Sequence, residues 1–228
     1  MNSDLSFELR IIYDNKCLEE GFLPGFGFSS LIYNHFTGNY LLFDTGGNGN
    51  ILIHNIQRFN IDISQIKKVI ISHNHHDHMG GLEEIYKVNP KMEIYIPIGN
   101  LKAYKKSFMT TNVFGISDLF EIEQNIYSSG QLGGSFVKEQ AIFLKTRKNE
   151  IIIVVGCAHP GLEQFIIKGR QIGKIIAIFG GFHGFNKFSY LNGVEIIGAC
   201  HCTQYLNVIR EKFPKQFQRV CVGNSFSF

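Results

Sequence analysis

No apolar run in the 228-residue sequence reaches the roughly 18 residues that a membrane-spanning helix needs, so we expect no membrane partner. The opening residues, MNSDLSFELR, include acidic residues where a signal peptide would have basic ones, which predicts a cytoplasmic protein. The sequence also has no Ser/Pro/Gly-rich linker and no internal repeat. With 44% hydrophobic and 18% charged residues, its composition is that of a globular protein rather than a disordered chain.

A strong excess of one charge is lacking as well. The chain has 22 basic and 19 acidic residues, a net charge of +3 with neutral histidines, and its lysines are scattered. This weak, dispersed charge argues against nucleic acid as a partner and leaves a small-molecule substrate as the expected one. The five cysteines are an odd number in a chain too long to need disulfide staples, which predicts reduced thiols.

The apolar segments are short, often β-branched and separated by turn residues, which predicts many strands with helices between them. We expect strands over residues 5–13, 28–33, 39–43, 69–72, 93–96, 141–145, 151–155, 174–179, 194–199 and 217–222. We expect helices over residues 80–88, 100–106, 160–171 and 203–213. The mixture predicts an α/β (α+β) fold in one layered domain over residues 1–228. Residues 105–134 are the least periodic segment and would suit a lid or loop insertion.

Four of the nine histidines lie between positions 73 and 78, directly after a predicted buried strand. His73 and His75 are two residues apart, so in an extended backbone their side chains point the same way. Asp77 and His78 come after the strand, where the chain can curl back. Neutral imidazole binds zinc, iron or nickel, and a carboxylate adds a hard oxygen ligand. The cluster therefore predicts a metal site, with His76 as a spare histidine that faces the pocket or supports a ligand.

Residues 73–78 (HNHHDH), followed by Gly80-Gly81-Leu82, carry the HxHxDH pattern, and the chain resembles the metallo-β-lactamase-fold superfamily. The resemblance covers residues 8–228. It implies an αββα sandwich, two mixed sheets flanked by helices, with the metal site along the open edge between the sheets. It also implies further metal ligands at His159, which follows Gly156-Cys-Ala, and at His201, which follows a predicted strand.

The ligand set that this resemblance implies is His73, His75 and His159 for one ion, and Asp77, His78 and His201 for a second. The expected cofactor is zinc, as one or two divalent ions, with iron or manganese as alternatives. Asp44, in the turn Phe43-Asp-Thr-Gly46, is expected to brace the metal loop without binding the ion. Cys157 and Cys202 flank ligand positions and are expected to be small packing residues.

Four short sequence motifs resemble those of the subgroup named for a dihydropterin–ribofuranosylaminobenzene phosphate synthase. They lie at residues 27–32, 156–161, 180–183 and 201–203. Gln204 and Gly184 depart from the pattern of that subgroup.

The metal bridge is a larger departure. Dinuclear members of the superfamily bridge two ions with an Asp between the third and last ligand histidines, whereas the six Asp of this chain all lie at or before position 118. Either His183, which follows the matching strand, takes that place, or the site binds one ion firmly and a second weakly.

The expected function is that of a metal-dependent hydrolase or related transferase, acting on a small, phosphorylated or pterin-like substrate through a metal-bound hydroxide. Asp77 and His183 are the expected catalytic residues. Asp77 would orient the water or accept its proton, and His183 would stabilise developing charge or protonate a leaving group. The alternatives are a nucleic-acid phosphodiesterase, which the weak charge disfavours, and a non-catalytic metal-binding or sensing protein, which the complete ligand set disfavours.

Overall fold

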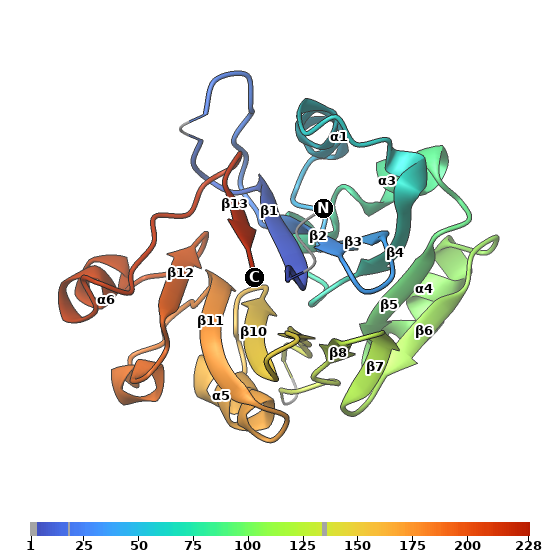
Figure 1. Ribbon diagram of the computed structural model, residues 1–228. Coiled ribbons are helices and arrows are strands. Elements are labelled where there is room, and N and C mark those ends of the chain that lie inside the picture. Colours follow the sequence, from blue (N-terminus) through green and yellow to red (C-terminus); the bar gives the residue numbers. More distant parts are fainter. Residues whose placement is uncertain (1–3, 18, 134–135) are drawn as a thin grey trace.

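The structure is a computed structural model that describes residues 4–17, 19–133 and 136–228. Two β-sheets lie face to face, and helices cover their outer faces (Figure 1). Each sheet contains both parallel and antiparallel strand pairs. The predicted fold class, two mixed sheets flanked by helices, is therefore confirmed.

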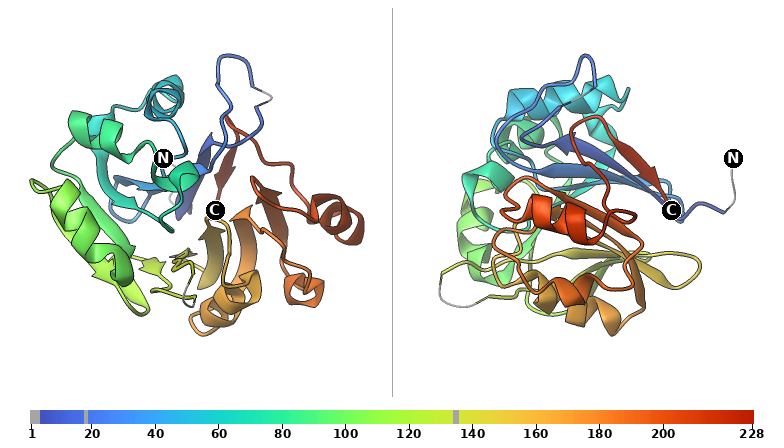
Figure 2. Two further views of the ribbon diagram at one scale, coloured as in Figure 1. Left: turned by 180° about the vertical axis from the view of Figure 1, so that it is seen from behind. Right: turned by 90° about the vertical axis from the view of Figure 1, so that its left-hand side faces the viewer.

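Within the described residues, the first sheet has seven strands in the order β13-β1-β2-β3-β4-β5-β6. The strands are β1 (Phe7–Tyr13), β2 (Ser29–Asn34), β3 (Asn39–Phe43), β4 (Ile66–Ile70), β5 (Glu93–Pro97), β6 (Val113–Ile116) and β13 (Ser225–Ser227). β1 to β3 pair antiparallel, and β3 to β6 run parallel. The first and last strands of the chain lie side by side, because β1 pairs with β13 (Figure 2).

The second sheet, counted over the same described residues, has six strands in the order β12-β11-β10-β9-β8-β7. The strands are β7 (Phe120–Glu123), β8 (Ile126–Ser128), β9 (Ile142–Lys145), β10 (Glu150–Val155), β11 (Lys174–Gly181) and β12 (Ile196–Cys200). β10, β11 and β12 run parallel, so their carboxyl ends lie at one edge. That edge adjoins the carboxyl ends of β3 and β4 in the first sheet, because Gly156, which follows β10, lies against Ser72 and Asp44.

The α-helices are α1 (Gly49–Arg58), α2 (His76–Met79), α3 (Leu82–Val88), α4 (Leu101–Ser107), α5 (Leu162–Arg170) and α6 (Leu206–Lys212). α1 and α3 pack on the outer face of the first sheet through Leu52, Ile56 and Ile85. α5 packs on the outer face of the second sheet through Phe165 and Ile166. α1 begins at Asn48, whose side chain accepts hydrogen bonds from two backbone amides of the first turn, a common start for a helix.

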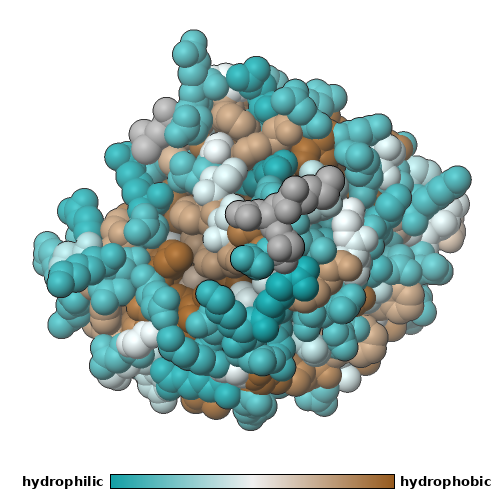
Figure 3. Space-filling view, viewed as in Figure 1, coloured by the Kyte–Doolittle hydropathy of each residue, from teal (hydrophilic) through white to brown (hydrophobic). Residues whose placement is uncertain are grey.

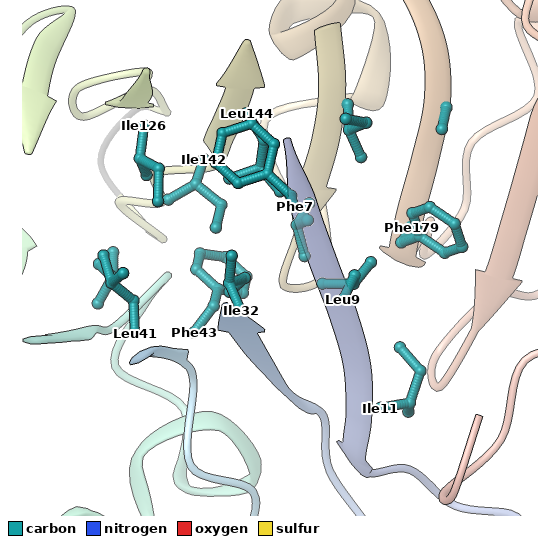
Figure 4. Packing of buried hydrophobic residues seen from close by; sticks show 14 of the residues in the cluster. Phe7, Leu9, Ile11, Ile32, Leu41, Phe43, Ile126, Ile142, Leu144 and Phe179 are labelled. Atoms are coloured by element: carbon teal, nitrogen blue, oxygen red, sulfur yellow. The ribbon is translucent and has the colours of Figure 1, made fainter. Parts of the chain in front are cut away.

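The main hydrophobic core lies between the two sheets (Figure 4). In β1, Phe7, Leu9 and Ile11 alternate along the strand and all face this core, because successive side chains of a strand point to opposite faces. Leu144 and Phe179 face them from the second sheet. The sheets are thus joined by apolar burial, which holds the carboxyl ends of their strands together.

Residues 105–134, expected to suit a lid or loop, include β6, which extends the first sheet, and β7 and β8, which extend the second; residues 134–135 lie outside the described residues. The strand predicted over residues 217–222 is wrong, since Phe217 and Val222 each form only an isolated bridge.

The surface is mainly hydrophilic on the face shown in Figure 3, with a group of hydrophobic residues over β11 and β12. None of the helices within residues 4–17, 19–133 and 136–228 combines the length and the apolar character that crossing a bilayer requires.

Candidate metal centre

The histidine-rich segment connects β4 to α2 at the edge where parallel strands of both sheets end. His73 follows β4 and is buried, whereas His75 is exposed immediately before α2. In the second sheet, His159 follows β10 and His201 follows β12. The crevice outside the carboxyl ends of parallel strands is where α/β sheets usually bind ligands, and here both sheets bring histidines to it.

His73, His75 and His159 form a first group, whose donor atoms all lie within 4.8 Å of one another. Nε2 of His73 lies 3.1 Å from Nδ1 of His75. The ring centroid of His159 lies 4.6 Å from that of His73 and 4.8 Å from that of His75. Three rings from two sheets therefore converge on one point.

Asp77, His78, Cys157 and His201 form a second group, also within 4.8 Å. Nε2 of His78 lies 3.2 Å from Nε2 of His201 and 3.1 Å from Sγ of Cys157. Oδ2 of Asp77 lies 3.1 Å from Nε2 of His201. The structure thus brings all six sequence-predicted ligands into these two groups. It also brings in Cys157, whose thiol faces the group, whereas the sequence analysis interpreted this residue as packing.

Four histidines present one ring nitrogen to an oxygen and turn the other toward their group, namely His73, His78, His159 and His201. Nδ1 of His78 lies 2.7 Å from Oδ2 of Asp44. Asp44 also accepts hydrogen bonds from the backbone N–H of Ser72, at 2.6 Å, and from the Ser72 hydroxyl, at 2.7 Å. Because that hydroxyl donates to Asp44, its oxygen accepts from Nδ1 of His73, 2.9 Å away. Asp44 braces the loop as the sequence predicts.

Two residues that the sequence analysis did not single out hold the other histidines. Glu139 is buried, and its carboxylate accepts hydrogen bonds from the three backbone amides of residues 157–159 and from Nδ1 of His159. Oδ1 of Asn15 accepts from Nδ1 of His201 at 3.0 Å. Neither Glu139 nor Asn15 lies in a motif or a periodic pattern, so only the fold reveals these contacts.

This pattern leaves lone pairs facing one another. A neutral imidazole that donates from Nδ1 has an unprotonated Nε2. In the tautomers in which His78 and His201 both donate from Nδ1, their Nε2 atoms are unprotonated and lie 3.2 Å apart. A cation between them removes the repulsion, and a metal-binding histidine usually donates its other N–H to an oxygen in this way. The residues present are therefore suited to a divalent metal ion.

Burial sets the protonation of the site. It lowers the pKa of both His73 and His78 to about 3, which leaves the neutral rings that bind metals. Burial acts against the ionisation of Glu139, but the hydrogen bond from His159 brings its pKa down to about 2. Burial raises the pKa of Asp44 to about 8. A cation in the neighbouring group would favour the ionised form of that carboxyl, because opposite charges attract.

The loops at the site have an unusual backbone. Asp44, Ala158, His183 and His201 have φ of 59°, 56°, 40° and 49°, in the left-handed region that costs non-glycine residues of order 1–3 kcal/mol each. At Gly156, a Cβ would lie 2.2 Å from Oγ of Ser72, so glycine allows the end of β10 to approach the metal loop. These conformations persist because the surrounding sheets impose them.

The two remaining sequence-predicted residues lie outside both groups. His183 is exposed, and its ring centroid lies 5.1 Å from that of His159, so it adjoins the first group. It follows β11, the strand expected from the sequence to end where the bridging Asp usually lies. His76 is exposed and lines a cavity of about 650 Å³ between α3 and α4, which agrees with its interpretation as a pocket-facing residue.

The five cysteines, all within the described residues, are reduced thiols. Cys157 and Cys202 lie side by side. The hydrogen bond between their side chains raises the pKa of Cys157 and lowers that of Cys202. Cys202 belongs to neither group of donor atoms.

A cavity of about 330 Å³ borders His201. Lys16, Arg210 and Arg219 line it, together with Asp14, whose carboxylate accepts a hydrogen bond from the backbone N–H of His201 at 3.0 Å. Three cations against one carboxylate give the lining a net positive charge, which favours an anionic ligand.

Comparisons with known proteins agree with this arrangement. A family model described as the metallo-beta-lactamase superfamily matches residues 23–142. The 7,8-dihydropterin-6-methyl-4-(beta-D-ribofuranosyl)-aminobenzene-5'-phosphate synthase of Methanocaldococcus jannaschii is 28% identical over 250 residues, covering 82% of this chain and 84% of that protein. The resemblance found in the sequence is therefore confirmed.

Solved structures agree on the fold. The metallo-beta-lactamase fold protein YhfI from Bacillus subtilis has a TM-score of 0.71 at 13% identity, covering 97% of this chain and 99% of that chain. A diphosphatase from the PhnP family has a TM-score of 0.67 at 12% identity, covering 97% of both chains. At these identities the likeness is one of fold.

Proposed function

This chain belongs to the metallo-beta-lactamase superfamily, and on that premise we propose that it is a metal-dependent hydrolase or related transferase acting on a small phosphorylated or pterin-like substrate. The observation that carries the proposal is the convergence of two groups of donor atoms at one edge of the sandwich. In both groups, ring nitrogens face one another while oxygens hold the opposite ring nitrogens.

Each group would hold one divalent ion, with zinc proposed first and iron or manganese as alternatives. His73, His75 and His159 would bind the first ion, and Asp77, His78 and His201 the second. When bound, such an ion lowers the pKa of a coordinated water to about 7 and polarises a substrate oxygen.

Asp77 is the proposed proton acceptor. It is partly buried, and burial acts against its ionisation, but in the metal-free protein the hydrogen bond with Nε2 of His201 holds its pKa below the usual range. Asp77 is therefore a carboxylate at neutral pH, and its second oxygen can orient a water or accept a proton.

His183 is the proposed acid. Its ring is exposed beside His159, where it can reach a substrate that enters from solvent. Histidine is the side chain that most often transfers protons in active sites, so this position suits protonation of a leaving group or stabilisation of charge that develops on it.

The positively charged cavity next to His201 supports a phosphorylated substrate. Arg210 and Arg219 offer planar guanidinium groups, which bind phosphate oxygens in pairs. The relative from Methanocaldococcus jannaschii is named for the synthesis of a dihydropterin compound that carries a 5'-phosphate, which also supports this substrate class.

The experiment that tests the proposal is metal analysis of protein purified without chelator, followed by assays on phosphoesters, thioesters and lactones. We expect a bound divalent metal and turnover of a phosphoester. His159→Ala should lose the first ion and the activity. His54→Ala, in α1 and outside both groups of donor atoms, is the matched control and should keep both. Protein that takes up no divalent metal would rule out the proposal.

A further inference from the structure

The second group of donor atoms contains a thiol in addition to its imidazoles and its carboxylate. No Asp follows position 118 in the sequence. Asp77, His78 and His201 supply one carboxylate and two imidazoles, and Sγ of Cys157 lies within 4.8 Å of each of their donor atoms. The nearest of them, Nε2 of His78, is 3.1 Å from the sulfur.

The spacing of these atoms is that of a coordination shell. A tetrahedron with zinc–nitrogen, zinc–oxygen and zinc–sulfur bonds of roughly 2.0–2.3 Å has edges of about 3.3–3.6 Å. Nε2 of His78 lies 3.2 Å from Nε2 of His201 and 3.6 Å from Oδ2 of Asp77. Together with the 3.1 Å contact to Cys157, these distances fall close to such edges.

The backbone around Cys157 is fixed by its contacts with neighbouring segments. Glu139 accepts a hydrogen bond from the backbone N–H of Cys157 at 2.9 Å, and Gly156 lets the loop pass close to Ser72. Cys157 is 3% exposed, yet it belongs to none of the three clusters in which buried apolar side chains pack together. A small packing residue would face one of those cores, whereas this thiol faces imidazole nitrogens.

The neighbouring Cys202 provides a contrast. Its sulfur lies 4.0 Å from the carbonyl oxygen of Cys157, outside the group of four donor atoms. The two thiols are therefore neighbours, but only that of Cys157 belongs to the group of donor atoms around His78 and His201. Cys202 is a matched control for any effect of a thiol near the site.

We propose that Cys157 is a thiolate ligand of the second metal position, beside Asp77, His78 and His201. This inference rests on the proposed function, since it assumes that the site binds divalent metal. On binding, a metal–sulfur bond forms and the thiol proton is released to water. The thiolate supplies the negative charge that a bridging Asp would bring, and it selects zinc or iron over magnesium or manganese because soft sulfur prefers softer cations.

The test is titration of the metal-free protein with cobalt(II), followed by absorption spectroscopy. We expect two equivalents to bind, and a thiolate-to-cobalt charge-transfer band in the near ultraviolet to grow with one of them. Cys157→Ser should abolish the band and weaken that equivalent at least about tenfold, since a hydroxyl is a poor ligand for this class of metal. Cys202→Ser should keep the band, because its sulfur lies outside the group of donor atoms.

A second measurement needs no variant and covers a Cys157→Ser protein that fails to fold. X-ray absorption of the zinc-loaded wild-type protein should show a zinc–sulfur distance of about 2.3 Å. Two bound equivalents with neither a sulfur distance nor a charge-transfer band overturn the inference and leave the proposed function standing. A band that survives in Cys157→Ser and disappears in Cys202→Ser also overturns it. Failure to bind any cobalt or zinc overturns both.

Discussion

The carboxylate of Glu139 lies 2.9 Å from Nδ1 of His159 and accepts hydrogen bonds from the backbone amides of residues 157–159. A single buried side chain thus fixes both the orientation of a proposed ligand ring and the loop that presents it. Oxygens that hold the far nitrogen of a metal-binding histidine also make the ring a better ligand.

Glu139→Gln should therefore damage both stability and metal binding. The new amide places N–H donors against N–H groups, and an unsatisfied buried group costs about 1–3 kcal/mol in the free energy of unfolding. Metal affinity should fall by about 10–100-fold. Urea unfolding and competition with a chromophoric chelator measure the two effects. Glu83→Gln, on the exposed face of α3, should change neither, and a Glu139→Gln protein with wild-type affinity would contradict the assignment.

Removal of metal should lower the melting temperature. Without a cation, Nε2 of His78 and Nε2 of His201 face each other at 3.2 Å, whereas a ligand present at 100 times its dissociation constant stabilises a protein by about 2.7 kcal/mol. Thermal unfolding before and after dialysis against chelator measures this shift. Added zinc should restore the original value in the wild type and only part of it in His78→Ala. An unchanged melting temperature in the wild type would show that no ion joins these residues.

Gly156→Ala should destabilise the protein because its Cβ would lie 2.2 Å from Oγ of Ser72 and 3.2 Å from Oδ2 of Asp44. Forcing an extra methyl group into such a contact costs typically about 1–3 kcal/mol. Gly184→Ala is the matched control, since its nearest neighbour would be Oε1 of Gln204 at 3.6 Å. Urea unfolding curves for the two variants should separate clearly. Equal stabilities would mean that β10 and the metal loop approach each other less closely than described.

His183→Ala should reduce turnover by about 10²–10⁴-fold, the usual contribution of a positioned acid or base. Its metal content should stay at the wild-type level, because the ring lies outside both groups of donor atoms. Steady-state kinetics on an established substrate, together with metal analysis, tests both statements. Full activity would reduce His183 to a residue of the turn after β11.

Much of the fold could be predicted from the sequence because its strands bury regular patterns of apolar side chains. The strand predicted over residues 39–43 matches β3 at both ends, and the metal motif follows β4 as expected. Residues 217–222 show where the same reasoning fails. That segment has apolar residues at suitable spacing, but in the folded protein Phe217 and Val222 meet different partners, Ile197 and Cys17, and no ladder forms. Strand formation depends on a neighbour that the segment itself cannot specify.

The candidate site, too, could be predicted only in part from the sequence. The histidines could be predicted because their spacing is itself a signal of metal binding. Glu139 and Cys157 could not, since a lone Glu is usually a surface residue and a lone Cys is usually a packing residue. Their roles arise only when β10 ends next to the loop after β4.

The proposed ligands come from both sheets, and His75 and His159 are 84 residues apart in the sequence. An unfolded chain would rarely bring such distant side chains together, because closing long loops is entropically unfavourable. The apolar core between the sheets, which includes Leu9 and Phe179, can bring them together without any cation. The ion is therefore expected to enter a protein whose sandwich is already folded. Loading would be a late step in maturation, governed by metal supply and by access to the open edge rather than by the folding of the chain.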